Sequence, residues 1–430
     1  MIVLKFSSIE TIFNSKPYPK HLLNAVLFSS LMFGSLLSSV SGTALAGDRE
    51  QAKRIHDRIA GVPPSADVLD AMEADIAADT ETNNAISAAF TAMENTAFYD
   101  VTLKNLAAPW TNEAMSSFVP LNDYTATVIG LVRDDIDFRT LLSGDVVYIG
   151  DSDLNLDNDY SISNNNHYED LEEGGHSLKD YLVSVAQSSV NGLPTEATAG
   201  VLTSRAAAKS FFKDGTNRAM FRFTALNHLC NDMEQLNDIS RVPDRIRQDV
   251  SRSPGGDSRI FLNSCIGCHS GMDPMAQSFA YYNYEYDAAG DPDGVNGNIA
   301  YNSEGDTDDI TGSRVQAKYH FNATNFEFGY VTPDDQWKNY WREGQNMILD
   351  WDPSLTGTGN GAKSMGQELA HSDAFSECQV SKVFENVCLR SPVDATDRSQ
   401  IDSMVASFKS VNYKLKQVFA ESAVYCAQDL

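Results

Sequence analysis

One five-residue segment carries the clearest chemistry in this chain. Residues 265–269 read Cys-Ile-Gly-Cys-His, so two thiols are separated by two residues and an imidazole follows directly. Thiols at this spacing can each add to a vinyl group on one edge of a porphyrin, which gives two thioether bonds. The adjoining imidazole can then bind the iron as proximal ligand. The pattern therefore indicates one covalently bound haem c, held by Cys265, Cys268 and His269.

Three other interpretations of this segment stay open. A zinc site needs four ligands, and no matching second Cys–His pair is present in the sequence. A thioredoxin-like redox pair is typical of a βαβ context, which does not surround this motif. A plain disulfide between Cys265 and Cys268 would leave the neighbouring histidine without a role. The haem interpretation uses all three residues.

The residue opposite His269 on the iron would decide the function. A second His or a Met closes the iron and gives an electron carrier, whereas an open position permits peroxide or oxygen chemistry. Residues 341–347 end in Met347 and resemble the Gly-x-x-Met loop of small class I cytochromes. We therefore expect Met347 as the distal metal ligand, with a buried methionine in a Trp-rich patch as the alternative. His320 is expected on the exposed face of a strand.

The first 46 residues read as an export signal. Three lysines precede an apolar run over residues 22–40, and residues 44–46, Ala-Leu-Ala, form a small-residue cleavage site. The alternative is an uncleaved membrane anchor. No later stretch is apolar enough to span a bilayer, so we expect a soluble mature chain, beginning at Gly47, in the periplasm or secreted.

Charge limits the partners that the chain can have. The net charge of the 430 residues is −27, and loss of three lysines and one glutamate with the signal takes it to −29. This balance argues against nucleic acid and anionic membranes as partners. The negative charge suits a soluble, basic redox partner or a salty medium, and its simpler interpretation is a solvated acidic surface.

Four cysteines remain outside the haem motif. An even number in an oxidising compartment predicts two disulfides, for which three connectivities are possible. We favour Cys388–Cys426, which would tie the ends of the last helical unit, and therefore Cys230–Cys378.

Apolar periodicity predicts a mainly α, multi-helical fold with a cytochrome c-like haem segment and a small β-hairpin insertion. The regions expected are a signal peptide at 1–46, a helical region at 47–255, the haem segment at 256–360 and a helical region at 361–430. The Asp/Asn-rich loop at 151–175 departs from the calcium-binding EF-hand template, so solvation is its favoured interpretation over calcium. The predicted elements are helices at 48–60, from Ser65 onward, 82–107, 121–133, 178–188, 203–212 and 216–230, a short helix at Phe138–Leu141, a strand at 145–149, a hairpin at 315–330 and helices from 362 to the end.

Several segments together are similar to one known family. Residues 265–274, Cys-Ile-Gly-Cys-His-Ser-Gly-Met-Asp-Pro, resemble the CxxCHxxMDP signature of planctomycete-cytochrome-like secreted proteins. Residues 199–203, 216–218 and 375–380 resemble other parts of these proteins. The family's glycine-rich run after the signature is replaced here by residues 275–279. The resemblance implies a secreted haem c protein that transfers electrons, and it supplies no substrate.

We therefore expect an exported monohaem c-type cytochrome with a role in electron transfer. The alternative is a haem-dependent enzyme of peroxidase or oxidase type with an open distal iron site. Familiar bacterial dihaem peroxidases carry two Cys-x-x-Cys-His motifs, and this chain has one. Whether the chain is an enzyme stays open at this point.

Overall fold

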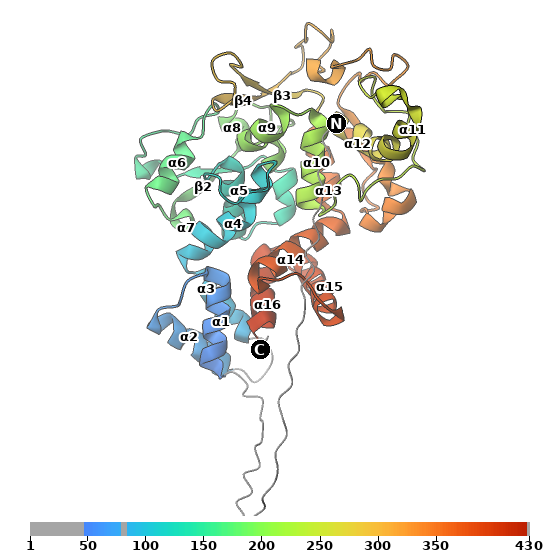
Figure 1. Ribbon diagram of the computed structural model, residues 1–430. Helices are drawn as coiled ribbons and strands as arrows, with labels where there is room; N and C mark the ends of the chain where they lie inside the picture. The colour runs from blue at the N-terminus through green and yellow to red at the C-terminus, as the bar shows by residue number, and fades with distance from the viewer. Residues whose placement is uncertain (1–46, 79–83, 428–430) are drawn as a thin grey trace, which may run out of the picture. The chain divides into compact units, whose positions relative to one another are not determined.

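The computed structural model describes residues 47–78 and 84–427, and helices dominate this part of the chain (Figure 1). The expected signal segment, residues 1–46, lies outside the described residues. The prediction of a mainly α, multi-helical fold is confirmed. The α-helices are α1 Asp48–Ala60, α2 Ala66–Ala77, α3 Asn84–Met93, α4 Lys104–Ala107, α5 Asp123–Arg133, α6 Asn166–Glu173, α7 Leu178–Tyr181, α8 Gln187–Val190, α9 Arg205–Phe212, α10 Asn217–His228, α11 Ser258–Ile260, α12 Ile266–Ala276, α13 Gly361–Ala370, α14 Asp373–Cys388, α15 Ala395–Ser410 and α16 Leu415–Ala427.

The strands are short and form three antiparallel pairs in the described chain. β1 Val147–Gly150 pairs with β2 Leu182–Val185, β3 Tyr282–Tyr286 with β4 Gly297–Tyr301, and β5 Gln336–Lys338 with β6 Thr358–Asn360. The β3–β4 pair is the hairpin of the haem region (Figure 1). Five residues separate the end of α12 at Ala276 from the start of β3 at Tyr282, so a β-hairpin exists after the Cys265–His269 segment but at a different place from the predicted one.

The predicted hairpin at 315–330 is wrong. Residues Ala317–His320 form a 3-10 turn, and Tyr330 makes only an isolated bridge with Arg247. The alternation of apolar residues that suggested strands has another cause. Val315 and Tyr319 are buried in a small cluster with Ala280 and Tyr281, and the Tyr319 hydroxyl donates to the Ala276 carbonyl.

The helix expected at 178–188 is also wrong. It stops after one turn, and residues Leu182–Val185 continue as β2, with Val185 opposite Val147. β-Branched residues favour a strand when a partner strand is available, and the partner here is more than thirty residues away in the sequence.

The helix expected over 82–107 breaks after Met93. A π-turn, Phe98–Leu103, follows the break, and the Asn95 side chain accepts from the Ala97 amide between the two.

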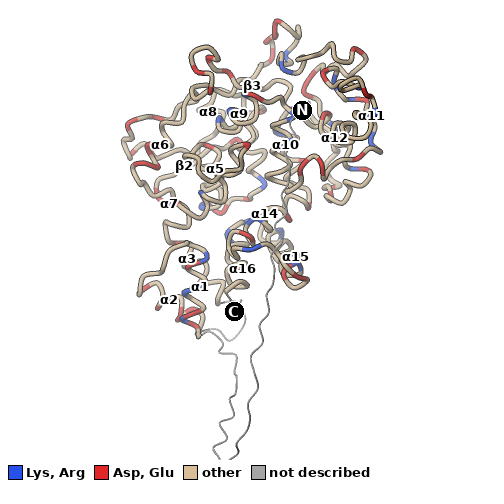
Figure 2. Tube along the Cα trace, viewed as in Figure 1, with Lys and Arg blue, Asp and Glu red and all other residues tan. Residues whose placement is uncertain are grey.

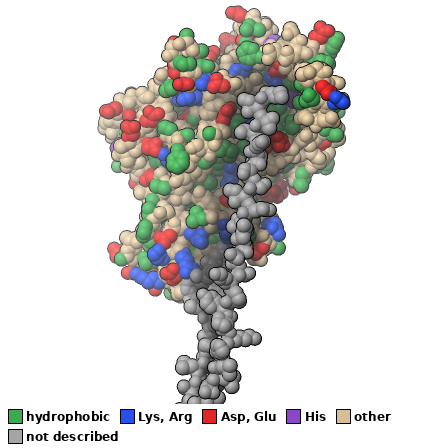
Figure 3. All heavy atoms as spheres, viewed as in Figure 1, with side chains coloured by type: hydrophobic (Ala, Val, Ile, Leu, Met, Phe, Trp, Pro, Cys, Tyr) green, Lys and Arg blue, Asp and Glu red, His purple; other side chains and the backbone are tan. Residues whose placement is uncertain are grey.

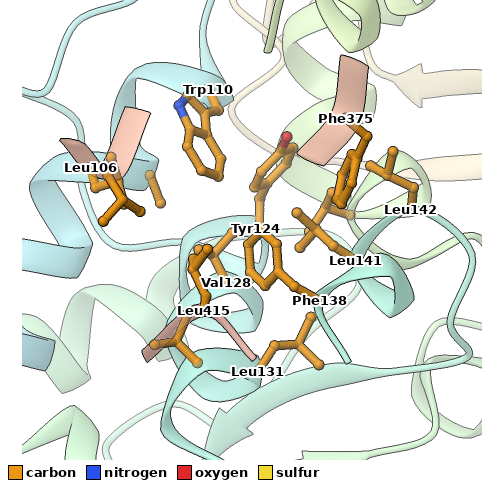
Figure 4. Packing of buried hydrophobic residues seen from close by; sticks show 14 of the residues in the cluster. Leu106, Trp110, Tyr124, Val128, Leu131, Phe138, Leu141, Leu142, Phe375 and Leu415 are labelled. Carbon is orange, nitrogen blue, oxygen red and sulfur yellow. The ribbon is translucent and has the colours of Figure 1, made fainter. Parts of the chain in front are cut away.

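The other helical predictions agree with the structure. Ser65 caps α2 by accepting from the Val68 amide at 3.3 Å, and Asn122 caps α5 by accepting from the Thr125 amide at 3.0 Å. Nearly all of α5 is buried, and side chains from distant helices pack around it (Figure 4). The labelled members of this core are Leu106, Trp110, Tyr124, Val128, Leu131, Phe138, Leu141, Leu142, Phe375 and Leu415.

One buried apolar cluster reaches from Ala52 to Ala427. Helix α16 packs against α1 and α3, so the two ends of the described chain lie together (Figure 1). The regions divided at residues 255 and 360 therefore share a core.

Both predicted disulfides are present. Cys230 pairs with Cys378 at a Cα–Cα distance of 5.2 Å, and Cys388 pairs with Cys426 at 5.5 Å. These bonds fit an oxidising compartment such as the periplasm or the cell exterior. None of the helices in the described ranges is both long enough and apolar enough to cross a bilayer.

Candidate haem site

The haem motif lies where a π-turn becomes an α-helix. Phe261–Cys265 forms the π-turn, and α12 then carries Cys268 and His269 in its first turn. The helical segment begins after Asp257, whose side chain accepts from the Arg259 amide at 2.9 Å. Residues three apart on a helix share a face, so both thiols lie on one side of this segment, with the imidazole next to them.

The two motif cysteines are free and half-buried. The structure pairs the other four cysteines and leaves Cys265 and Cys268 unpaired, so it does not contain the alternative disulfide. The Cys268 thiol donates to the Met233 carbonyl at 3.2 Å, and burial raises the pKa of this thiol. Two unpaired thiols, three residues apart on one helical segment, fit the attachment of one porphyrin edge.

The imidazole of His269 is oriented by a carboxylate one helical turn later. Its Nδ1 lies 2.9 Å from Oδ1 of Asp273, and the His269 side chain is 20% exposed. An ionised carboxylate can only accept hydrogen bonds, so Nδ1 carries the proton and donates. The Nε2 lone pair is therefore the one available to a metal. A ligating histidine fixed through its other nitrogen is a recurrent feature of metal sites.

A buried network of two carboxylates and two guanidiniums supports Asp273. The Arg218 guanidinium donates to Asp273 at 2.6 and 2.8 Å and to Asp249 with two bonds of 2.8 Å. Arg247 donates from its side chain to Asp249 at 2.9 Å and from its backbone amide to Asp273 at 3.3 Å. Burial alone would raise the pKa of Asp273, but Arg218 and His269 hold the pKa well below its usual range. Asp273 is therefore ionised at neutral pH.

Two glycines let neighbouring segments approach α12 closely. A Cβ on Gly267, between the motif cysteines, would lie 1.7 Å from Oδ1 of Asn237, and a Cβ on Gly271 would lie 2.0 Å from Nε1 of Trp341. The Asp238 amide also donates to the Gly267 carbonyl at 3.2 Å. The loop around residue 238 and the segment around Trp341 therefore both pack closely against α12.

Met347 belongs to a 3-10 segment, Gly344–Leu349, that is hydrogen-bonded to the chain just before residue 238. The Asn346 side chain donates to the Leu236 carbonyl at 2.9 Å, and the Gln345 side chain donates to the Asn237 carbonyl. Met347 itself is 59% exposed, so it is not the buried core methionine of the alternative interpretation. These contacts bring its segment into the neighbourhood of the motif, and its bond to iron stays a prediction.

Apolar side chains that contact water flank the motif. Ile260 and Leu262 precede it with 45% and 55% of their surface exposed, and Ile239, which lies against Gly267, is 70% exposed. A porphyrin presents two large apolar faces, and burying such side chains beneath it would be favourable. The free thiols, the oriented imidazole and these uncovered apolar groups together fit a bound haem.

The other His and Met residues considered as ligands are buried or half-buried. His320, expected on an exposed strand, is half-buried in the 3-10 turn, which corrects that prediction. His228 is fully buried, with Nε2 2.7 Å from the Tyr124 hydroxyl. Met365 is a core residue, and Met272 is buried on α12.

Within residues 47–78 and 84–427, no group of three or more His, Cys, Asp and Glu side chains is placed to hold a metal ion. Haem iron does not require such a group, because the porphyrin supplies four of its ligands. In the acidic loop that suggested calcium, Asp151 instead accepts from the Asp153 amide at 2.9 Å, which closes a local turn.

Sequence reasoning missed the network behind His269. The sequence analysis includes Asp273 only as part of the family signature, although its position four residues after His269 on a helix predicts a contact. Arg218 and Asp249 are 55 and 24 residues away from it in the sequence, and no local pattern joins them.

Comparison with known proteins gives no relative for this chain. No family model matches it, and no curated protein or solved structure does. The resemblance of residues 265–274 to planctomycete-cytochrome-like proteins therefore stays a prediction.

Proposed function

We propose that this chain is an exported, monohaem c-type cytochrome that transfers electrons. One observation carries the proposal. The thiols of Cys265 and Cys268 are free and half-buried beside an imidazole whose Nδ1 is held by Asp273. Of the interpretations considered, haem c is the one that uses both thiols and the free imidazole nitrogen.

Each side chain has a distinct role in this proposal. Cys265 and Cys268 would fix one edge of the haem, and His269 would bind the iron through Nε2. Met347, in the segment held by the hydrogen bond between Asn346 and Leu236, would be the second protein ligand of the iron. The haem, when bound, supplies a one-electron couple, while the chain binds, orients and shields it.

The partner that we propose is a soluble, basic redox protein outside the cytoplasm. The chain carries a net charge of −27, and acidic residues are spread along its loops and helices (Figure 2). Acidic side chains are scattered over the face drawn in Figure 3. A partner of opposite charge would be attracted to such a surface, and the attraction would weaken as salt is added. The two disulfides support an extracytoplasmic location.

An optical spectrum of the purified protein, matured with haem and mixed with cyanide or carbon monoxide, tests this function. We expect low-spin iron with a Met–iron band and no binding of added ligands. Met347→Ala should abolish that band, whereas Met115→Ala, at another exposed methionine, should leave it unchanged. An unchanged spectrum of Met347→Ala would reject the distal ligand. High-spin iron that binds ligands readily would favour the alternative, an enzyme of peroxidase or oxidase type.

A further inference from the structure

We infer that Asp273 is a positioning residue that keeps the proximal imidazole of His269 basic and thereby lowers the reduction potential of the haem iron. The inference rests on the proposed function, since it requires haem at Cys265 and Cys268.

The geometry leaves Asp273 no freedom to turn away from His269. Its Oδ1 accepts from His269 Nδ1 at 2.9 Å and from Arg218 Nε at 2.6 Å. Its Oδ2 accepts from Arg218 Nη2 at 2.8 Å and from the Arg247 amide at 3.3 Å. The Asp273 side chain is completely buried, so water does not compete for these oxygens.

The charge on Asp273 is only partly neutralised by its arginine. Arg218 divides its hydrogen bonds equally between Asp273 and Asp249, with two bonds to each carboxylate. Arg247 also pairs with Asp249 rather than with the Asp273 side chain. A carboxylate that retains negative charge draws the Nδ1 proton toward itself, which raises the basicity of the imidazole as a ligand.

A more basic ligand and a nearby negative charge both favour the oxidised metal. One electron from a reduced partner protein converts ferric to ferrous iron, and the Nδ1 proton stays on His269 in both states. The ferric state carries one more positive charge, so the buried carboxylate stabilises it more than the ferrous state. Hydrogen bonding behind the axial ligand is one of the ways in which a protein sets a haem potential.

Potentiometric titration of the haem-loaded protein and of Asp273→Asn tests the inference. The amide keeps the size and an acceptor oxygen but removes the charge. We expect the ratio of ferrous to ferric iron at a fixed potential to rise, and each tenfold rise in this ratio corresponds to about 59 mV for a one-electron couple. The matched control is Asp397→Asn, which removes another buried carboxylate paired with an arginine, Arg390, and should leave the potential unchanged.

A second variant keeps the test decisive if Asp273→Asn fails to mature. Residue 249 does not contact His269. Asp249→Asn removes the second carboxylate that pairs with Arg218, so the positive charge of Arg218 neutralises Asp273 more fully. We therefore expect a smaller shift of the reduction potential, with the same sign. A potential for Asp273→Asn equal to that of Asp397→Asn would overturn the inference, as would an unchanged Asp249→Asn if only that variant matures. A wild-type protein without haem would instead reject the proposed function, so the two failures are distinguishable.

Discussion

Single residues decide which chemistry is available at residues 265–269. The thiols are predictable from the sequence, because their spacing is specific for haem attachment. The choice of imidazole nitrogen depends on Asp273, which lies one turn later on the same helix face. The charge state of Asp273 depends on Arg218, which belongs to a different helix, α10. Local spacing therefore predicts the proposed ligand set, and tertiary contacts determine the hydrogen bonds and charges behind His269.

His228 leads to a prediction about the pH dependence of stability. It is fully buried between Trp110 and Tyr124, and burial lowers the pKa of His228 to about 3, with Lys382 adding to this effect. Below its usual pKa of about 6.5 the unfolded chain binds a proton that the folded chain refuses. The contribution of this imidazole to the free energy of unfolding is therefore fully present above about pH 6.5. That contribution decreases as the pH falls from about 6.5 toward about 3.

The measurement is urea unfolding at pH 7 and pH 5 for the wild type and His228→Gln. Other titrating groups contribute equally to both proteins, so the difference between them isolates the imidazole. We expect the wild type to lose about 2 kcal/mol more than the variant between the two pH values. Equal losses would show that His228 is protonated in the folded protein.

At the scale of the elements, helices with a continuous apolar face were predictable. Helices α1, α14 and α16 follow the three–four spacing of buried residues closely. Elements whose structure depends on a partner far away in the sequence could not be predicted. Residues Leu182–Val185 become a strand because β1 is beside them, and the 315–330 segment loses its strand pattern because Tyr319 bonds to the end of α12.

The close packing of α12 on Trp341 gives a prediction for Gly271→Ala. The added Cβ would lie 2.0 Å from Nε1 of Trp341, so the buried indole or the helix must move. We expect the free energy of unfolding to fall by about 1–3 kcal/mol, the usual cost of overpacking. Gly47→Ala is the control, because a Cβ there meets nothing within 4 Å; it replaces the N-cap glycine of α1 and should cost about 0.5 kcal/mol. A Gly271→Ala protein as stable as this control would show that the segment around Trp341 does not pack tightly on α12.

At the scale of the whole molecule, the two disulfides connect parts of one core. Cys230–Cys378 closes a loop with a sequence separation of 148 and joins the end of α10 to α14, and Cys388–Cys426 closes one of 38 between α14 and α16. The pairing was predictable because cysteine number and compartment limit it to few possibilities. The shared core could not be predicted, because the residues that form it are scattered from Ala52 to Ala427.

Removing each disulfide should destabilise the protein in the order of the loop lengths. Chain-entropy reasoning gives about 5 kcal/mol for the longer loop and about 4 kcal/mol for the shorter one. The paired variants Cys230→Ser with Cys378→Ser, and Cys388→Ser with Cys426→Ser, are compared by denaturant unfolding. A larger loss for the shorter loop would contradict this account of their stabilising effect.

The mass of one tryptic peptide tests the central claim most directly. Cleavage after Arg259 and Arg314 releases residues 260–314, which contain the whole haem motif and no other lysine or arginine. For protein purified from cells that attach haem to c-type cytochromes, we expect this peptide to carry the mass of one added haem and to show Soret absorption. The same peptide at the mass of its amino acids alone, without visible absorption, would contradict it.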